Sequence, residues 1–474
     1  MSAVDEDGAG QGPHPAGIED PSQVDKCGKI KSFGILRLQK NFLSVVDLFA
    51  GCGGFGLGLE QAGFTPIYVN ELNKDARGTY ISNRMDRHEW FARDLNKETW
   101  LNPFSSSDAR RIAKKDHVQK LEDRFKSEFG IHHGEIDLIV GGPPCQGFSG
   151  IGHRRSYAVD KKLLPSNHLY KDMARIIGQL RPRAFVFENV RGLLTGRWTE
   201  GGKSGEIWKA VKESFAGIGE YKLAAELVYA KNYGVAQNRP RIVLVGIRRD
   251  IAGSVTYKDE VETIDGTGIS GGFLPRGQPD SAPSIIDLLG DLVDPLHQNG
   301  GVTLGYPSRA MCEVQRHFRT SADGTKVASK GDPITEHEYS KHRSDIIEKF
   351  RAMIHGDEVE ATKKFAQRVL PREWGLSGPT ITATSLPDDY VHFEQPRTLS
   401  VREWARLQGF PDWYQFKGKR TTGGVRRAGN PLEGLHFREL PKYTQIGNAV
   451  AVPMAKAIGE HLAGILRSGL LERN

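Results

Sequence analysis

Short apolar runs alternate with longer mixed segments between Phe42 and Arg249. Apolar runs of roughly four to eight residues bounded by turn residues are typical of buried strands. The segments between the runs, such as Met173–Leu180, have apolar side chains at helical spacing. The pattern therefore predicts an α/β fold with a mostly parallel sheet covered by helices on both faces. The predicted strands are Leu43–Ala50, Pro66–Val69, Ile136–Val140, Ala184–Phe187 and Arg241–Ile247.

Two further segments have the spacing of amphipathic helices. Apolar residues recur at helical intervals over Val118–Phe129, in a segment that is otherwise polar. The same spacing returns over Met454–Ile465, directly after Pro453, a residue that suits the first turn of a helix. We expect a surface-packed helix at the first segment and a final helix ending at Gly469 at the second.

The alternation of strands and helices stops after Arg249. The segment Glu262–Pro283 is crowded with Gly and Pro, which predicts a domain boundary. Residues 251–395 have no strong period and predict a smaller, irregular domain. The segment Gln395–Tyr443 contains ten Lys or Arg against four acidic residues, which predicts a basic surface or loop. Residues 1–40 lack periodicity and predict a mobile N-terminal tail.

The composition narrows the class of protein. Of 474 residues, 38% are hydrophobic and 26% charged, as in soluble globular proteins. No stretch approaches the ~18 consecutive apolar residues of a membrane span, and the acidic first 25 residues do not resemble a signal peptide. The four cysteines form no C-x-x-C pair, so we expect neither a disulfide framework nor a zinc site, and a cytoplasmic location. The net charge of +7 is compatible with a polyanionic partner.

A glycine-rich turn follows the first predicted strand. Gly51 and Gly53 allow a sharp turn that admits a nucleoside-like ligand at the carboxyl end of the strand. Glu71 ends the second strand and is placed to accept ribose hydroxyls, and Asp94 is placed to take an adenine amino group. Phe49 is either a core residue or a stacking partner for adenine. Such a turn fits a nicotinamide dehydrogenase about as well as a methyltransferase, and a purely structural turn remains an alternative.

A second cluster, Gly141-Gly142-Pro143-Pro144-Cys145-Gln146-Gly147-Phe148-Ser149, follows the strand that ends at Val140. Two prolines stiffen the backbone as it leaves the sheet and present Cys145 at the ligand-binding edge. A thiolate held in this way is a candidate nucleophile, and a buried structural thiol is the alternative. The loop that follows contains Arg154 and Arg155, which can close over a phosphate backbone.

Two more groups lie at strand ends of the predicted sheet. Glu188 ends an apolar strand, where a partly desolvated carboxyl can hold a proton and deliver it to a ring nitrogen. Arg239 and Arg241 alternate at the start of another strand and project to one side, where they can orient a carboxylate, a phosphate or a base carbonyl. A structural acid and solvated surface charges are the alternatives.

Taken together, the motifs resemble those of DNA cytosine-5 methyltransferases of the prokaryotic, restriction-modification type. The resemblance covers residues 43–465 and rests, in order, on DLFAGCGGFGLG, GGPPCQGFS, FENVRG, YGVAQNRPR, PRTLSVREWARLQGFPDWY and YTQIGNAVAVPMA. It implies a Rossmann-like S-adenosylmethionine-dependent methyltransferase fold with a smaller, irregular target-recognition domain. The implied division is a catalytic domain at 41–250, a recognition domain at 251–395, and a return segment with the final helix at 396–474 that completes the catalytic domain.

The resemblance also implies a reaction and a set of site residues. Cys145 adds to carbon 6 of a cytosine flipped out of double-stranded DNA, Glu188 acts at N3, and Arg239 and Arg241 lie near the base carbonyl. No metal is implied. Gln146, Arg154 and Arg155 are the implied DNA contacts. The implied S-adenosylmethionine contacts are Phe49, Gly51, Gly53, Glu71, Asp94, Pro144, Leu169, Asn448 and Val450.

The protein is expected to be a monomer that protects host DNA from a cognate restriction endonuclease. The segments Asn102–His133 and Lys417–Arg427 look like insertions relative to compact members of the family. Three alternatives remain at this stage. A transfer RNA cytosine-5 methyltransferase shares the catalytic blocks, a non-catalytic DNA-binding relative would lack Cys145 or Glu188, and a nicotinamide oxidoreductase accounts only for the glycine-rich turn.

Overall fold

The computed structural model describes residues 42–84, 100–144, 165–252, 260–263, 272–279, 281–360, 367–371, 380–383, 387, 389–421 and 439–471. Several predictions concern positions outside these ranges. They are the tail at residues 1–40 and the site residues Asp94, Cys145, Gln146, Arg154 and Arg155.

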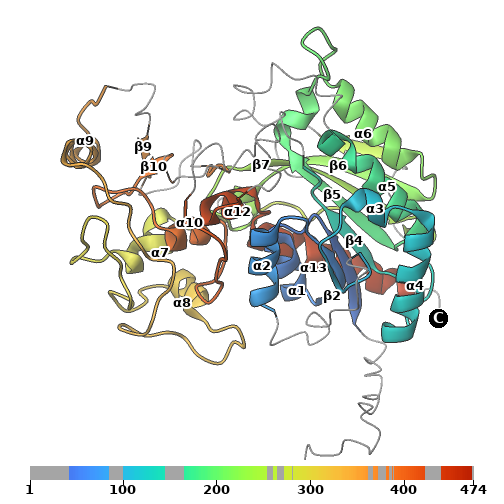
Figure 1. Ribbon diagram of the computed structural model, residues 1–474, viewed down its shortest axis with the longest axis horizontal. Helices are drawn as coiled ribbons and strands as arrows, with labels where there is room; N and C mark the ends of the chain where they lie inside the picture. Colours follow the sequence, from blue (N-terminus) through green and yellow to red (C-terminus); the bar gives the residue numbers. More distant parts are fainter. Residues whose placement is uncertain are drawn as a thin grey trace, which may run out of the picture. The chain divides into compact units, whose positions relative to one another are not determined.

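All five predicted strands belong to one eight-stranded sheet, which has the strand order β3-β2-β1-β4-β5-β7-β6-β8 (Figure 1). Strand β7 is antiparallel to both of its neighbours, and the other pairs are parallel. The prediction of a mostly parallel sheet is therefore confirmed. The strands are β1 (Leu43–Leu48), β2 (Phe64–Asn70), β3 (Phe104–Ser105), β4 (Leu138–Gly141), β5 (Ala184–Val190), β6 (Tyr221–Tyr229), β7 (Pro240–Arg248) and β8 (Glu260–Thr263).

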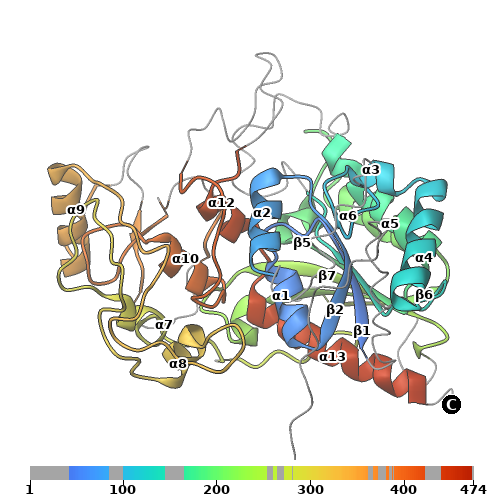
Figure 2. The same ribbon diagram turned by 60° about the horizontal axis from the view of Figure 1, so that its bottom comes forward.

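Helices cover both faces of the sheet because alternate residues of each strand point to opposite faces. In β1, Val46 and Leu48 enter one apolar core, and Leu43 and Val45 enter the other. The first core is closed by α3 (Ala109–Ile112), α4 (Lys115–Phe129), α5 (Leu169–Leu180) and α6 (Glu206–Ala216). The second is closed by α1 (Gly54–Gln61) and α13 (Val452–Leu471) (Figure 2).

The two predicted amphipathic helices are present. The first is α4, preceded by the short helix α3. The second is α13, which continues to Leu471, two residues past its predicted end. Helix α13 packs closely on α1, because a Cβ at Gly58 would lie 2.5 Å from the Cβ of Ala455 and 2.6 Å from the Val452 carbonyl oxygen. A side chain larger than hydrogen at Gly58 would force these two helices apart.

The stretch Lys442–Gly469 passes a length and composition test for a membrane-crossing helix, with 61% of its most apolar window buried inside the protein. The expectation of no such stretch concerned uninterrupted apolar runs, and Lys456 and Glu460 interrupt this one. Since α13 packs on α1 and contributes Met454, Ile458 and Leu462 to the second core of the sheet, the helix is a core element of this fold.

The described residues between 285 and 416 are called here the irregular region. Their apolar cluster includes Leu288, Trp404 and Phe410, and it extends to Leu57 of α1 and Tyr443. The helices and strands here are α7 (Ile285–Leu289), η8 (Gly290–Leu292), α8 (Glu313–Arg319), α9 (Ser344–His355), β9 (Arg368–Val369), β10 (Tyr390–Val391) and α10 (Val401–Leu407). The remaining elements are α2 (Lys74–Ser82), η4 (Pro165–His168), η5 (Arg191–Thr195), η6 (Ala230–Tyr233) and α12 (Lys442–Asn448).

The sheet extends past residue 250, the predicted end of the catalytic segment. Strand β8 pairs with β6, and Phe273 and Leu274 lie in the same core as α13. In the other direction, Val401 and Trp404 of α10 share the apolar cluster of Ile285 and Leu292. The packing therefore continues across both predicted boundaries, and the four-part division stays a prediction.

The prediction of a basic surface over Gln395–Tyr443 is wrong for three of its arginines. Arg397, Arg402 and Arg406 are no more than 2% exposed. Both Arg397 guanidinium nitrogens Nη1 and Nη2 donate to Glu403, at 2.8 and 2.7 Å, and Arg406 pairs with Asp291 and Asp412. A count of charges along the segment does not reveal that Arg406 pairs with Asp291, which lies far away in the sequence.

Candidate functional site

The predicted site residues gather where the parallel strands end. The carboxyl ends of β1, β2, β4 and β5 lie at one edge of the sheet, and open α/β sheets bind ligands at this edge. The turn Phe49–Gly53 follows β1, Glu71 follows β2, and Gly142–Pro144 follow β4. Glu188 lies near the end of β5. Arg241 starts the antiparallel strand β7 and so reaches the same edge.

The turn after β1 has a left-handed backbone at Phe49, Gly51 and Gly53, with φ of 56°, 58° and 90°. Glu71 fixes one side of this turn: its carboxylate accepts the N–H of Gly51 at 2.8 Å and the N–H of Asn73 at 2.6 Å. Burial raises the pKa of Glu71, and these two hydrogen bonds offset only part of that rise. A Cβ built at Gly51 meets no atom within 4 Å, so the backbone there borders open space.

Leu72 is a site feature that the sequence analysis missed. It directly follows Glu71 and is 61% exposed, which is unusual for a leucine at the end of a buried strand. Large apolar side chains exposed beside polar groups are common in binding sites. The sequence signal for Leu72 was an apolar residue immediately after the acidic residue at the end of the second predicted strand.

Glu188 and Arg241 form the ion pair of the site. The Arg241 Nε atom lies 2.7 Å from Glu188 Oε1, and the two side chains are 11% and 12% exposed, respectively. Burial lowers the pKa of Arg241, and the neighbouring Glu188 charge offsets only part of the effect. The sequence placed these two residues on different strands, and the antiparallel pairing of β5 with β7 brings them together.

The same strand end contacts the stem of the cysteine loop. A Cβ at Gly142 would lie 3.0 Å from Glu188 Oε2, and the Asn189 side-chain amide donates to the Pro143 carbonyl oxygen at 3.0 Å. Glu188 therefore lies beside the segment that leads into Cys145. Pro144, the last described residue before that cysteine, is exposed.

Arg239 has other partners. Its guanidinium donates to the main-chain carbonyls of Ile381 at 3.0 Å, Gly447 at 2.5 Å and Ala449 at 2.8 Å, and the residue is 1% exposed. Burial and then the Arg241 charge hold the pKa of Arg239 well below its ordinary value. These contacts support the backbone on both sides of Asn448.

The remaining predicted cofactor residues lie at the ends of two helices. Leu169 is the first residue of α5 and is half-buried. Asn448 is exposed at the end of α12, and Val450 is buried two residues later. A Cβ at Gly54 would lie 2.4 Å from the Val450 carbonyl oxygen, so the segment after α12 packs on the start of α1 beside the glycine turn.

The two cysteines that the structure describes are not exposed nucleophiles. The Cys52 thiol is 1% exposed and donates to the Gln445 carbonyl oxygen at 3.3 Å, and burial raises the pKa of this thiol to about 12. Cys312 is partly buried, with its thiol 3.5 Å from the Asp287 carbonyl oxygen. These contacts are typical of structural thiols.

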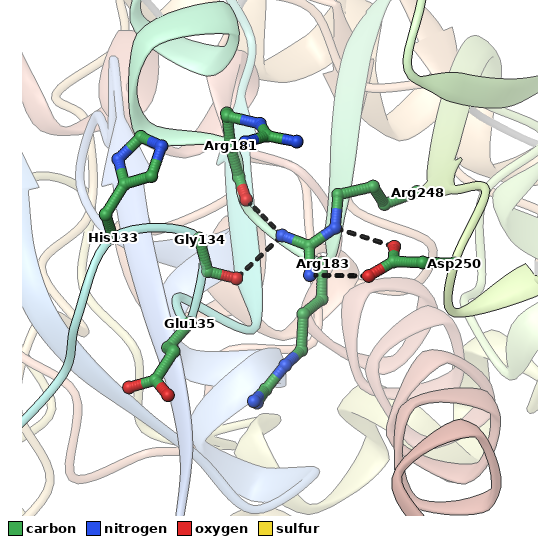
Figure 3. Close-up of a pocket in the computed structure, with 7 residues that line it drawn as sticks. All are labelled: His133, Gly134, Glu135, Arg181, Arg183, Arg248 and Asp250. Carbon is green, nitrogen blue, oxygen red and sulfur yellow. Dashed lines mark hydrogen bonds and ion pairs between the residues drawn. The ribbon is translucent and has the colours of Figure 1, made fainter. Parts of the chain in front are cut away.

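A polar cavity of about 320 Å³ lies at the opposite edge of the sheet (Figure 3). It is lined by residues that precede β4 and β5 and by residues at and after the end of β7, including Arg181, Arg183 and Arg248. Figure 3 shows the Arg248 guanidinium between the carbonyl oxygens of Gly134 and Arg181 and the carboxylate of Asp250. Arg183 pairs with Asp137, and Arg181 with Glu220. These arginines have partners within the protein, and the cavity is remote from the predicted site.

The strand order and the ligand-binding edge define a Rossmann-like methyltransferase fold. A crystal structure described as a DNA modification methyltransferase encoded within an E. coli prophage superimposes with a TM-score of 0.59, at 23% identity, over 90% of this chain and 99% of the other.

The model of the family "C-5 cytosine-specific DNA methylase" matches residues 43–464, and the chain belongs to this family. It is 28% identical to the Type II methyltransferase M.DdeI of Desulfomicrobium norvegicum over 440 residues, covering 89% of this chain and 88% of that protein. It is also 28% identical to the Type II methyltransferase M1.HphI of Haemophilus parahaemolyticus, over 88% and 86% of the two chains.

Proposed function

We propose that the protein transfers a methyl group from S-adenosylmethionine to carbon 5 of a flipped-out cytosine in a specific double-stranded DNA sequence, through a covalent adduct of Cys145. The observation that carries this proposal is the position of the Glu188–Arg241 pair. It lies beside Gly142 and Pro143, three and two residues before Cys145, at the sheet edge that also holds the turn bound by Glu71.

The residues after β1 and β2 suit a nucleoside-containing methyl donor. Gly51 borders open space, and Glu71 offers a carboxylate at the end of β2, where ribose hydroxyls of such ligands are bound. Leu72 supplies an exposed apolar surface for an adenine ring. Phe49, Gly53, Pro144, Leu169, Asn448 and Val450 complete the proposed cofactor site, together with Asp94. When bound, S-adenosylmethionine supplies an electrophilic methyl group.

The chemistry at the base requires a nucleophile and an acid. Carbon 5 of cytosine is a weak nucleophile, and addition of the Cys145 thiolate to carbon 6 places electron density on it. The Glu188 carboxyl shares a proton with N3 while the thiolate adds, which limits the negative charge on the ring. Arg241 holds this carboxyl in place at 2.7 Å. Carbon 5 then attacks the sulfonium methyl group, and S-adenosylhomocysteine is the leaving group. A base removes the proton from carbon 5, and the electrons of that bond restore the double bond between carbons 5 and 6 as the thiolate leaves.

We propose that Arg239 supports the backbone of this site and that Arg241 contacts the base carbonyl. The Arg239 contacts to Ile381, Gly447 and Ala449 join the segment before β7 to two other segments of the backbone. Gln146, Arg154 and Arg155 are proposed to contact DNA, and residues 251–395 to read the target sequence. A cytoplasmic monomer paired with a cognate restriction endonuclease is the proposed biological setting, supported by the Type II relatives.

The test is mechanism-based trapping. Duplex DNA that carries 5-fluorocytosine at the target cannot lose fluorine as a cation, so the adduct should persist through boiling in detergent when S-adenosylmethionine is present. The Cys145→Ala protein should give no adduct, Glu188→Gln should form it much more slowly, and Cys52→Ala should still form it if folded. A transfer RNA substrate serves as the competing substrate. Absence of the adduct on DNA that the wild-type protein demonstrably methylates would overturn the mechanism.

A further inference from the structure

We infer that Arg84 and Tyr414 are positioning residues that fix the glycine turn after β1 for cofactor binding. The inference rests on the proposed role of this turn in holding S-adenosylmethionine. Neither residue belongs to the predicted set of site residues. Arg84 comes two residues after α2, and Tyr414 belongs to the segment that follows α10.

Arg84 is a buried cation with partners on four sides. It is 1% exposed, and its Nε atom lies 2.5 Å from Glu60 Oε1 of α1. Its Nη1 donates to the Tyr414 hydroxyl at 2.9 Å, and its Nη2 donates to the Gly53 carbonyl oxygen at 3.2 Å. The guanidinium carbon lies 3.7 Å from the centre of the Tyr80 ring. A planar guanidinium can serve these directions at once, whereas an ammonium group cannot.

Tyr414 holds the neighbouring carbonyl of the turn, that of Cys52. It is fully buried, and its hydroxyl donates to the Cys52 carbonyl oxygen at 2.6 Å while it accepts from Arg84. The contact is tight, because a Cβ at Gly53 would lie 2.7 Å from the Tyr414 hydroxyl and 2.9 Å from Arg84 Nη1. Gly53 therefore faces these two side chains, while Gly51 borders open space.

The turn is thus held from two sides. Glu71 accepts the N–H of Gly51 on one side, and Tyr414 and Arg84 donate to the carbonyls of Cys52 and Gly53 on the other. A buried carbonyl that loses its donor is left without water to replace it, so the turn would move to recover a hydrogen bond. Because glycine adopts positive and negative φ about equally readily, the backbone at Gly51 and Gly53 does not itself resist such a movement, and the side of the turn that borders open space would move as well.

The sharpest test removes one hydroxyl. Tyr414→Phe keeps the ring and leaves the Arg84–Glu60 pair intact, but it removes the donor to Cys52. The matched control is Tyr221→Phe, since the Tyr221 hydroxyl also donates to a buried main-chain carbonyl, that of Pro182 at 2.8 Å. Tyr221 starts β6, remote from the turn. Both variants should lose a similar amount of thermal stability.

Binding of S-adenosylmethionine, measured by calorimetry, separates the two variants. We expect the Kd of Tyr414→Phe to rise about tenfold, with kcat at saturating cofactor and the KM for DNA within twofold of wild type. Tyr221→Phe should bind with the wild-type Kd. Arg84→Lys, which retains a charge for Glu60, should weaken cofactor binding at least as much and serves as the second variant should Tyr414→Phe not fold.

The measurements distinguish a failure of the positioning role from a failure of the proposed function. A wild-type Kd in Tyr414→Phe and Arg84→Lys, or an equal change in Tyr221→Phe, would overturn the positioning role while leaving the proposed function intact. A wild-type protein that fails to bind S-adenosylmethionine would instead overturn the proposed function, and with it the role assigned to the turn.

Discussion

The central sheet and the irregular region bury different kinds of side chain. Strands β1, β4 and β5 place apolar residues on both faces of the sheet, in two continuous cores. The irregular region adds to its apolar cluster a set of buried charges that includes Arg397, Glu403 and Arg406. Burying apolar area stabilises a fold in proportion to the area, whereas a buried charge stabilises it only while its partner is present and ionised. The two regions should therefore respond differently to mutation and to pH.

The largest effect is expected at Arg406. This residue pairs with Asp291 and Asp412 through contacts of 2.5 and 2.6 Å, and all three side chains are almost completely buried. Arg406→Met removes the cation that Asp291 and Asp412 share, and leaves Asp291 with Arg319 at 2.7 Å and Asp412 with the Tyr306 hydroxyl at 2.8 Å. The loss of this buried charge should lower the free energy of unfolding by about 3–5 kcal/mol. Urea denaturation measures the loss, and hydrogen exchange should locate it in the irregular region. A loss below about 1 kcal/mol would mean that the pair does not hold this region together.

Histidines of the irregular region are one source of pH dependence in the stability. Asp47 of β1, whose pKa burial raises to about 8, acts with the opposite sign. Burial and then the Arg397 charge lower the pKa of His392 to about 4, and burial also lowers the pKa of His297, His337 and His342. Nδ1 of His392 accepts the N–H groups of Glu394 and Gln395, so its proton belongs on Nε2, 3.4 Å from Glu403.

The sign follows from which state takes up protons first. The unfolded chain binds a proton at His392 near pH 6.5, and the folded chain does so only near pH 4. The contribution of His392 to stability should therefore fall as the pH drops through this window, by about 2 kcal/mol between pH 7 and pH 5. His392→Asn keeps an acceptor near the position of Nδ1 and should flatten this dependence, as measured by urea denaturation at both pH values. An unchanged slope in the variant would refute the assignment to His392.

A smaller and pH-independent effect is expected in the sheet. Ile139 is fully buried in the central strand β4. Ile139→Val removes one methylene and should lower the free energy of unfolding by about 1 kcal/mol, equally at pH 7 and pH 5. If the loss doubled at the lower pH, the contrast between the two regions would not hold.

The smallest effect is expected at an exposed pair. Arg316 lies 2.7 Å from Glu313 on α8, but both side chains are largely in solvent. Solvent screening removes most of the attraction, so Arg316→Ala should leave the melting temperature within the error of the measurement. A clear drop would show that charges of the irregular region contribute even at its surface.

The sequence predicted the regular parts of the molecule better than the irregular ones. The runs Ala184–Phe187 and Arg241–Ile247 are continuous and apolar, and both became strands. Strand β6 was missed because Lys222 and Glu226 interrupt its apolar pattern, although Glu226 is buried. Periodicity reports which face a residue occupies, and it does not report a buried charge whose partner lies elsewhere in the chain.

At the candidate site too, the sequence predicted positions at strand ends but not contacts between distant segments. Glu188 and Arg241 were placed at one edge because strand ends in such a sheet meet there, and their 2.7 Å contact fits that reasoning. The partners of Arg239 and Arg84 come from distant segments, including Gly447 and Tyr414. No local pattern joins residues so far apart, so their contacts emerge only from the three-dimensional structure.

The close packing of α13 on α1 has a consequence for the order of synthesis. Val452 and Ala455, which lie against Gly58, are synthesised long after α1. Until then the face of α1 that packs on α13 lacks the apolar cover of that helix. We expect nascent chains that lack α13 to expose this face to chaperones, and the proposed cofactor site to form only after Asn448 and Val450 have been synthesised.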